Sequence, residues 1–129
     1  MDQKAKNTTG AGFSLPFIVG LAQDVASAGG GAQNTTIVTY PPATSGSFIV
    51  SVGVSCTTAD TVTAVLTYTD AVNTTAQTVT LFSAVAIGTN GVSGASFPAR
   101  ANTSSAILVK YTNSSQTTTK AWASIVQLN

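Results

Sequence analysis

Charge is scarce in this sequence. Its 129 residues include no histidine, all four acidic residues are aspartates, and charged side chains make up 7%, against about 25% in a typical soluble domain. The net charge of +1 gives no electrostatic basis for binding nucleic acid or an anionic membrane, so neither is predicted as a partner. The polar surface must therefore consist of threonine, serine, asparagine and glutamine. Such a neutral coat offers little repulsion against association, which favours an assembly subunit over a monomer.

Groups for acid–base chemistry are equally few. Asp60 and Asp70 stand at opposite ends of one predicted strand, roughly 30 Å apart, whereas the two carboxylates of a glycosidase lie about 5 to 9.5 Å apart. The sequence does not determine how far Asp24 lies from Asp60 or from Asp70. No histidine, cysteine and carboxylate residues are grouped as in a metal site, and the stretch AGGGAQ lacks the Lys-Ser/Thr of a phosphate-binding loop. The sequence therefore predicts that the protein is not an enzyme and holds neither cofactor nor metal.

The single cysteine, Cys56, excludes an intrachain disulfide. It continues an alternation formed by Phe48, Val50, Val52 and Val54, which places it on the same face of a strand. Because the chain has no histidine to activate the thiol, a nucleophilic role is not expected. Cys56 is predicted to be a small residue of the core.

The first 31 residues differ from the rest in composition, with a polar head, an apolar run and a Gly/Ala/Ser stretch. They are predicted to form an N-terminal arm, residues 1–31, ahead of a β-sandwich domain at residues 32–129. The apolar run, Phe13–Leu21, is shorter than the ~20 residues that cross a membrane. A signal peptide is the alternative, but Ser14 and Pro16 interrupt the apolar run, which favours a retained arm.

An apolar arm becomes ordered when it docks onto its own domain or onto a neighbouring subunit. The glycines Gly29–Gly31 are the predicted hinge of this arm. Its apolar side chains are predicted to bind a partner, and they are Phe13, Leu15, Phe17, Ile18, Val19 and Leu21.

Beyond the arm, apolar and hydroxyl side chains alternate over short segments. A period of two is typical of strands half buried in an antiparallel sheet. Threonine suits such strands, because its β-branching fits the pleat and its hydroxyl gives an outward face that is polar but uncharged. Strands are predicted at residues 34–40, 48–55, 61–69, 75–82, 84–89, 92–97, 107–111 and 120–128.

Turn signals separate these segments. Asp70–Thr74 predicts a hairpin loop, and Asn90-Gly91, the favoured dipeptide of a type I′ turn, predicts a second hairpin. Pro98 is predicted to end its strand or to leave that strand at a sheet edge. Short strands with frequent turns and no amphipathic helix predict an all-β, antiparallel two-sheet sandwich, jelly-roll-like, with an extended N-terminal arm. An immunoglobulin-like sandwich is the alternative, although its paired cysteines are absent.

The aromatic residues bear on sugar binding. Tyr68, Tyr111 and Trp122 are in register with apolar residues of their strands, which predicts that all three face the core. If they were instead exposed together with Tyr40, they would form the stacking platform of a carbohydrate-binding module. That alternative requires at least two exposed aromatics on one face.

Three segments within about residues 45–129 carry a resemblance: SGSFIVSVGVSCTTADTVTAVLTYTDAVNTTAQTVTL, GVSGASFPARANTSSAILVKYTNSS and AWASIVQLN. They resemble small β-sandwich virion proteins of tailed bacteriophages, which include head-decoration proteins and the knob domains of head or tail fibres. The shared features are a glycine-aromatic strand start, a TYTD strand end before a polar hairpin, and the segment SGASFPARANTSSAI. The resemblance implies a structural role, often as a trimer, and transfers no catalytic residue.

The resemblance and the neutral surface together favour a capsid decoration or cement protein, which is a minor capsid protein. Its expected partners are the major capsid protein and copies of itself, as a homotrimer, on the capsid surface of the virion after assembly in the host cytoplasm. A receptor-binding fibre knob is one alternative, with the loops near Asp70–Thr74 and Thr112–Thr119 contacting a host glycan. A secreted carbohydrate-binding module is the other.

Overall fold

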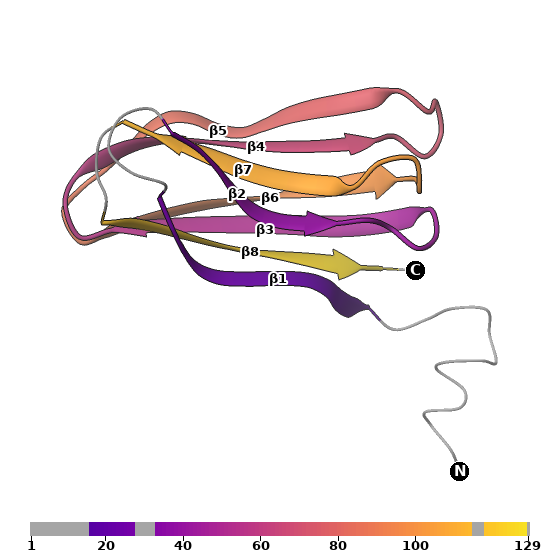
Figure 1. The fold of residues 1–129 in the computed structure, drawn as a ribbon, viewed down its shortest axis with the longest axis horizontal. Coiled ribbons are helices and arrows are strands. Elements are labelled where there is room, and N and C mark those ends of the chain that lie inside the picture. Colours follow the sequence, from indigo (N-terminus) through magenta and orange to yellow (C-terminus); the bar gives the residue numbers. More distant parts are fainter. Residues whose placement is uncertain (1–15, 28–32, 115–117, 129) are drawn as a thin grey trace, which may run out of the picture.

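The computed structural model describes residues 16–27, 33–114 and 118–128. They form two four-stranded antiparallel sheets packed face to face (Figure 1), with no helix among the described residues. The predicted all-β two-sheet sandwich is confirmed. The strands are β1 (Phe17–Ala26), β2 (Gln33–Tyr40), β3 (Gly46–Cys56), β4 (Asp60–Thr69), β5 (Ala76–Ile87), β6 (Gly91–Ala101), β7 (Ile107–Asn113) and β8 (Thr119–Gln127).

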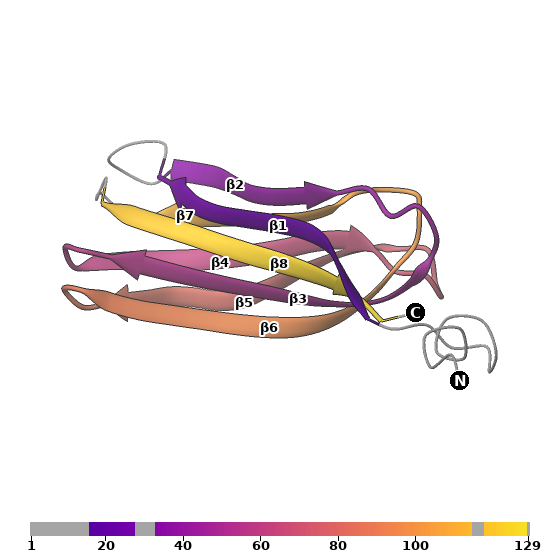
Figure 2. The ribbon, with the colours of Figure 1, turned by 90° about the horizontal axis from the view of Figure 1, so that it is seen from below.

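The order of the strands is that of a jelly roll. One sheet, here sheet A, has the order β1-β8-β3-β6, and the other, sheet B, has the order β2-β7-β4-β5. Figure 2 shows the four strands of sheet A side by side. Among the described strands, only β4 and β5 are consecutive and paired within a sheet, and they are joined by the predicted Asp70–Thr74 loop. Every other pair of consecutive strands is divided between the two sheets. Eight strands wound in this way form the two Greek keys of a jelly roll.

Alternating side chains of both sheets fill the core. On β3 the side chains of Phe48, Val50, Val52 and Val54 are buried, as predicted, and they meet the inward residues of β4 and β7 from the other sheet. Cys56 is also buried, and its thiol donates weakly to the carbonyl oxygens of residues 87 and 88. Burial, and then the negative charge of the Asp60 carboxylate, raise the pKa of the Cys56 thiol. Cys56 is therefore a core residue, as predicted.

The predicted hairpin around Asn90-Gly91 is wrong. The Gly91 N–H does bond the Gly88 carbonyl at 2.9 Å, and Asn90 has a φ of 57°, so a tight turn is present. However, β5 lies at the edge of sheet B and β6 at the edge of sheet A, so this turn carries the chain across the sandwich. A local turn signal does not show which sheet the next strand joins, because that is decided by distant pairing partners.

The predicted strands at 75–82 and 84–89 are a single strand, β5. Two register shifts interrupt its pairing with β4, and Ala84 sits at a φ of 49° within this irregular stretch. The irregularity broke the alternation that marks a strand in the sequence. Pro98 lies inside β6, an edge strand, which is the second of the two predicted placements.

Part of the predicted arm belongs to the sandwich. Phe17–Ala26 forms β1, which pairs with β8 at the edge of sheet A, so this segment docks onto its own domain. Two register shifts in β1, between Ile18 and Gly20 and between Ala22 and Val25, hide its alternation in the sequence. Phe13, Leu15 and the predicted hinge Gly29–Gly31 lie outside the described residues.

Removing β1 is expected to destabilise the sandwich. A chain that begins at Gln33 loses β1 and leaves the hydrogen-bonding edge of β8 unpaired, so we expect a lower melting temperature and concentration-dependent association. Thermal unfolding and light scattering measure both effects. A chain that begins at Pro16 keeps every described strand and is the control. Equal melting temperatures for the two chains would contradict this role of β1.

Candidate functional site

The one buried carboxylate of the described residues is Asp60, at the start of β4, with 7% of its surface exposed. Its Oδ1 accepts hydrogen bonds from the Thr61 N–H (2.8 Å), the Ser114 N–H (3.1 Å) and the Ser114 hydroxyl (2.6 Å). Its Oδ2 accepts from Asn113 Nδ2 (2.9 Å) and from the Thr119 hydroxyl (2.6 Å). We call this group of residues the Asp60 cluster.

The cluster joins strand ends from both sheets. Asn113 ends β7 in sheet B, whereas Thr119 begins β8 in sheet A. The Ser27 hydroxyl, just after β1, donates to Asn113 Oδ1 at 2.8 Å. Nearby, the buried Tyr111 hydroxyl crosses between the sheets to the Val25 carbonyl oxygen at 3.1 Å. The ends of four strands are therefore linked through polar contacts.

The chemistry of Asp60 is that of a structural anion. Burial alone would raise the pKa of this carboxyl, but the hydrogen bonds from Ser114, Thr119, Asn113 and Thr61 outweigh it and hold the pKa well below its usual range. A carboxylate this acidic, with both oxygens occupied by donors, is neither a general acid nor a base at neutral pH. The Asp60 cluster therefore holds the fold together rather than forming an active site.

Other candidate groups for chemistry are dispersed. Asp70 follows β4, at the opposite end from Asp60 as predicted, and its Oδ1 accepts the N–H groups of Val72 (2.7 Å) and Asn73 (3.1 Å). These two bonds lower the pKa of Asp70 and order the β4–β5 loop. In the part of the chain that the structure describes, no three His, Cys, Asp or Glu residues gather as metal ligands, and no helix is long and apolar enough to span a membrane.

Replacing Asp60 by asparagine is expected to destabilise the fold. The new amide places a donor where five donors already converge, so we expect a loss of about 2–4 kcal/mol in the free energy of unfolding. Urea denaturation of Asp60→Asn and of the wild type measures the difference. Asp24→Asn, the same change at an exposed position, is the matched control and should stay within about 0.5 kcal/mol of the wild type.

The Asp60 cluster also makes stability depend on pH. Since the folded-state pKa of Asp60 lies below the unfolded value of about 3.9, its contribution is fully present above that value and is lost as pH falls through the folded-state pKa. We expect the stability difference between the wild type and Asp60→Asn to shrink below about pH 4, measured by denaturation across pH. A difference that stays constant down to about pH 2 would show that the Asp60 charge is not the cause.

The outer face of sheet A is apolar at one end. Ile18 on β1, Val126 on β8, Ile49 on β3 and Pro98 on β6 lie in register, so a row of apolar side chains crosses all four strands. We call these four residues the apolar row. Ile18 is 60% exposed, and no charged residue belongs to the row. Pro98 is also exposed, whereas Ile49 and Val126 are half-buried, so the apolar row is a candidate contact surface.

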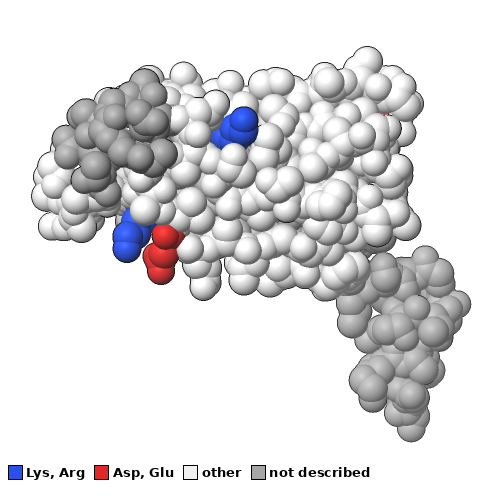
Figure 3. Space-filling model, in the orientation of Figure 1, with Lys and Arg blue, Asp and Glu red and all other residues white. Residues whose placement is uncertain are grey.

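The outer face of sheet B is different, because it is covered mainly by threonine. Val65, Leu108 and Lys110 interrupt a coat of outward hydroxyls, as the alternation predicted. Figure 3 shows how few charged side chains interrupt the uncharged surface on the side of the molecule that it presents. The outward threonines are Thr36, Thr39, Thr61, Thr63, Thr67, Thr78, Thr80 and Thr112.

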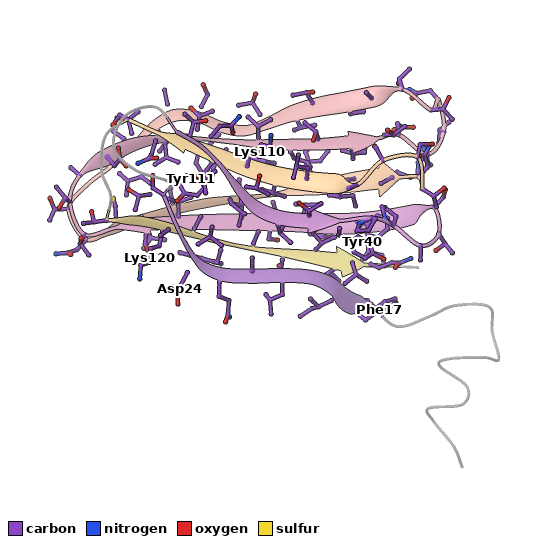
Figure 4. The ribbon with its side chains drawn as sticks, viewed as in Figure 1. Phe17, Asp24, Tyr40, Lys110, Tyr111 and Lys120 are labelled. Atoms are coloured by element: carbon purple, nitrogen blue, oxygen red, sulfur yellow. The ribbon has the colours of Figure 1, made fainter. Side chains whose placement is uncertain are left out.

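The predicted arm residues are placed as follows. Phe17 (51% exposed), Ile18 and Leu21 (58%) are exposed on β1, whereas Val19 is half-buried against the core. Figure 4 shows Phe17 at the end of β1 that lies beside the end of β8. The exposed three are available to a partner, and their role in binding stays a prediction.

The aromatic prediction is confirmed for two residues and wrong for the third. Tyr68 and Tyr111 are buried, and Tyr40 packs on Phe48 with ring centroids 6.1 Å apart. Trp122, however, lies on the outer face of sheet A and is 39% exposed. On β8, Ala121, Ala123 and Ile125 face the core, whereas Trp122 and Val126 face outward, which the sequence pattern did not indicate. The inward residues of β8 are Thr119, Ala121, Ala123, Ile125 and Gln127.

Comparisons with known proteins leave the family open. No known protein family matches the sequence, and no curated protein matches it. A solved structure of the N-terminal endo-1,4-β-D-xylanase 10B of Clostridium thermocellum, with CBM22-1 and GH10 modules complexed with xylohexaose, matches 84% of this chain. The match covers 29% of that chain, with 12% sequence identity and a TM-score of 0.42. A likeness this weak transfers no residue or activity to the present protein.

Proposed function

We propose that this protein is a structural subunit of a virion, of the capsid decoration or cement type, and that it contacts its neighbours through the apolar row. The partners are the major capsid protein and further copies of the chain, as a homotrimer on the capsid surface. The subunits are made in the host cytoplasm. The protein acts by packing rather than by catalysis.

The observation that carries this proposal is the contrast between the two outer faces. Sheet A presents the apolar row together with the exposed Phe17 and Leu21 on β1, beside outward serines and the exposed Arg100. Sheet B presents mainly hydroxyls and has no such row across its four strands. An apolar row in register across four strands is costly to leave in water, at roughly 25 cal/mol per Å² of apolar surface. With so few charges to repel a neighbour, burial against another subunit is the favourable outcome.

Two further points support a virion subunit. The strand order is that of a jelly roll, a fold that occurs in viral capsid proteins but also in lectins and cupins, so it supports the proposal without deciding it. The sequence resemblance to small phage virion proteins covers most of the sandwich.

A matched pair of substitutions tests the contact surface. Ile49→Lys places a charge in the apolar row at a central strand of sheet A, and Val65→Lys makes the same type of change at a central strand of sheet B. We expect Ile49→Lys to reduce self-association and particle binding at least about tenfold, while Val65→Lys has little effect. Analytical ultracentrifugation and sedimentation with purified particles measure both. Equal self-association and particle binding of the two variants would contradict the assignment of the contact surface to sheet A.

Copy number in purified particles separates the decoration role from the alternatives. Quantitative mass spectrometry against the major shell protein should give a count in simple proportion to the shell lattice. A single set per tail or vertex would instead favour a fibre knob. Absence from particles would overturn a virion role altogether.

A further inference from the structure

Trp122 lies beside an irregularity in the neighbouring strand. Ala22 pairs with Ala123 and Val25 with Ala121, so two residues of β1, Gln23 and Asp24, lie opposite Trp122 alone. This is a β-bulge, a feature that re-aims side chains and is common next to binding sites. Asp24 has a φ of 53°, which a non-glycine residue rarely adopts.

Trp122 is held over the backbone of β3. Gly53 pairs with Trp122 across the sheet, and a Cβ on Gly53 would come within 2.2 Å of the indole atoms Cε2 and Cζ2. The indole therefore occupies the space where a side chain of β3 would project, and Gly53 is buried although it lies on the outer face. The next residue across the sheet is also a glycine, Gly94. The indole is thus seated on the sheet and still 39% exposed.

The bulge and the indole enclose a shallow hollow. Gln23, Asp24 and Trp122 line an open space of about 340 Å³, wide enough for one ring of a ligand to lie on the indole. Within the described residues, the side chains of Gln23 and Asp24 make no hydrogen bond or ion pair. The hollow therefore combines one apolar ring with an amide and a carboxylate that are free to bond a ligand.

We infer that this hollow binds a neutral saccharide unit. A pyranose ring has an apolar face of C–H groups that suits an indole, and hydroxyls around its edge that suit an amide and a carboxylate. The Gln23 amide donates and accepts, and the Asp24 carboxylate accepts from two hydroxyls. A cationic ligand is less suited, because Lys120 lies on the same outer face of β8, and Figure 4 shows it near Asp24.

This inference goes beyond the proposed function and uses another part of the face. Trp122 is four residues from Val126 along β8, about 13 Å, so the hollow and the apolar row are separate positions on the outer face of sheet A. The site also differs from the β4–β5 and β7–β8 loops, to which the alternative of a fibre knob assigned glycan contact.

The single tryptophan of the chain makes binding directly observable. Fluorescence excited beyond the tyrosine band reports on Trp122 alone, so a sugar in the hollow should give a saturable change. The probes are the methyl glycosides of glucose, galactose, mannose, xylose and N-acetylglucosamine, their short oligosaccharides, and choline as a cationic comparison. A saturable response to at least one saccharide, with none to choline, is the expected result.

Variants locate the response. Gln23→Ala and Asp24→Asn keep the fluorophore and should each weaken binding at least about tenfold. Gly53→Ala keeps all three lining residues but displaces the indole, so it should shift the emission of the free protein and weaken binding as well. Lys110→Ala, on the outer face of sheet B, is the control and should bind as the wild type does.

Assembly and sugar binding can fail separately. Ile49→Lys should keep the saccharide response even if it loses association, because the apolar row lies outside the hollow. A response to choline alone, no response to any probe, or a response unchanged in Asp24→Asn and Gly53→Ala would overturn the saccharide site. None of these results would bear on the copy number in particles.

Discussion

The buried carboxylate of Asp60 is the interaction on which the sandwich most depends. A charge inside a protein is costly unless donors surround it, and Asp60 has five hydrogen bonds, from groups at the ends of β4, β7 and β8. Through Asn113 and Ser27 the same network reaches the end of β1. In a chain with so few charges, one anion thus fastens both sheets at one end, while apolar packing holds the rest.

Much of the fold could be predicted from the sequence, because β-branched and hydroxyl residues alternate so regularly. The alternation placed Phe48, Val50, Tyr68 and Cys56 inside correctly. It failed for Trp122, because β8 has alanine at the two inner positions on either side of Trp122 and its largest side chain on the outer face. The pattern of size reverses there, and only the pairing with Gly53 shows where the indole fits.

The remaining failures concern long-range partners. The bulges of β1 break its period of two, so the segment Phe17–Ala26 had the pattern of an arm rather than a strand. The turn at Asn90 was detected, but not that it joins two sheets. The Asp60 cluster and the hollow beside Trp122 both consist of residues that are distant in sequence, and no local motif indicates either of them. Composition indicated the neutral surface correctly, but not that an apolar row crosses one outer face while threonine covers most of the other.

The edge strands of the two sheets determine how aggregation of the protein depends on salt. Proteins often protect sheet edges with charged side chains, whose repulsion salt weakens. Here β1, β2 and β5 are interrupted by register shifts, and β6 carries Pro98. Irregular backbone and a missing N–H obstruct strand addition by shape, which dissolved ions do not screen. Resistance to edge-to-edge aggregation should therefore be the same at low and at high salt concentration.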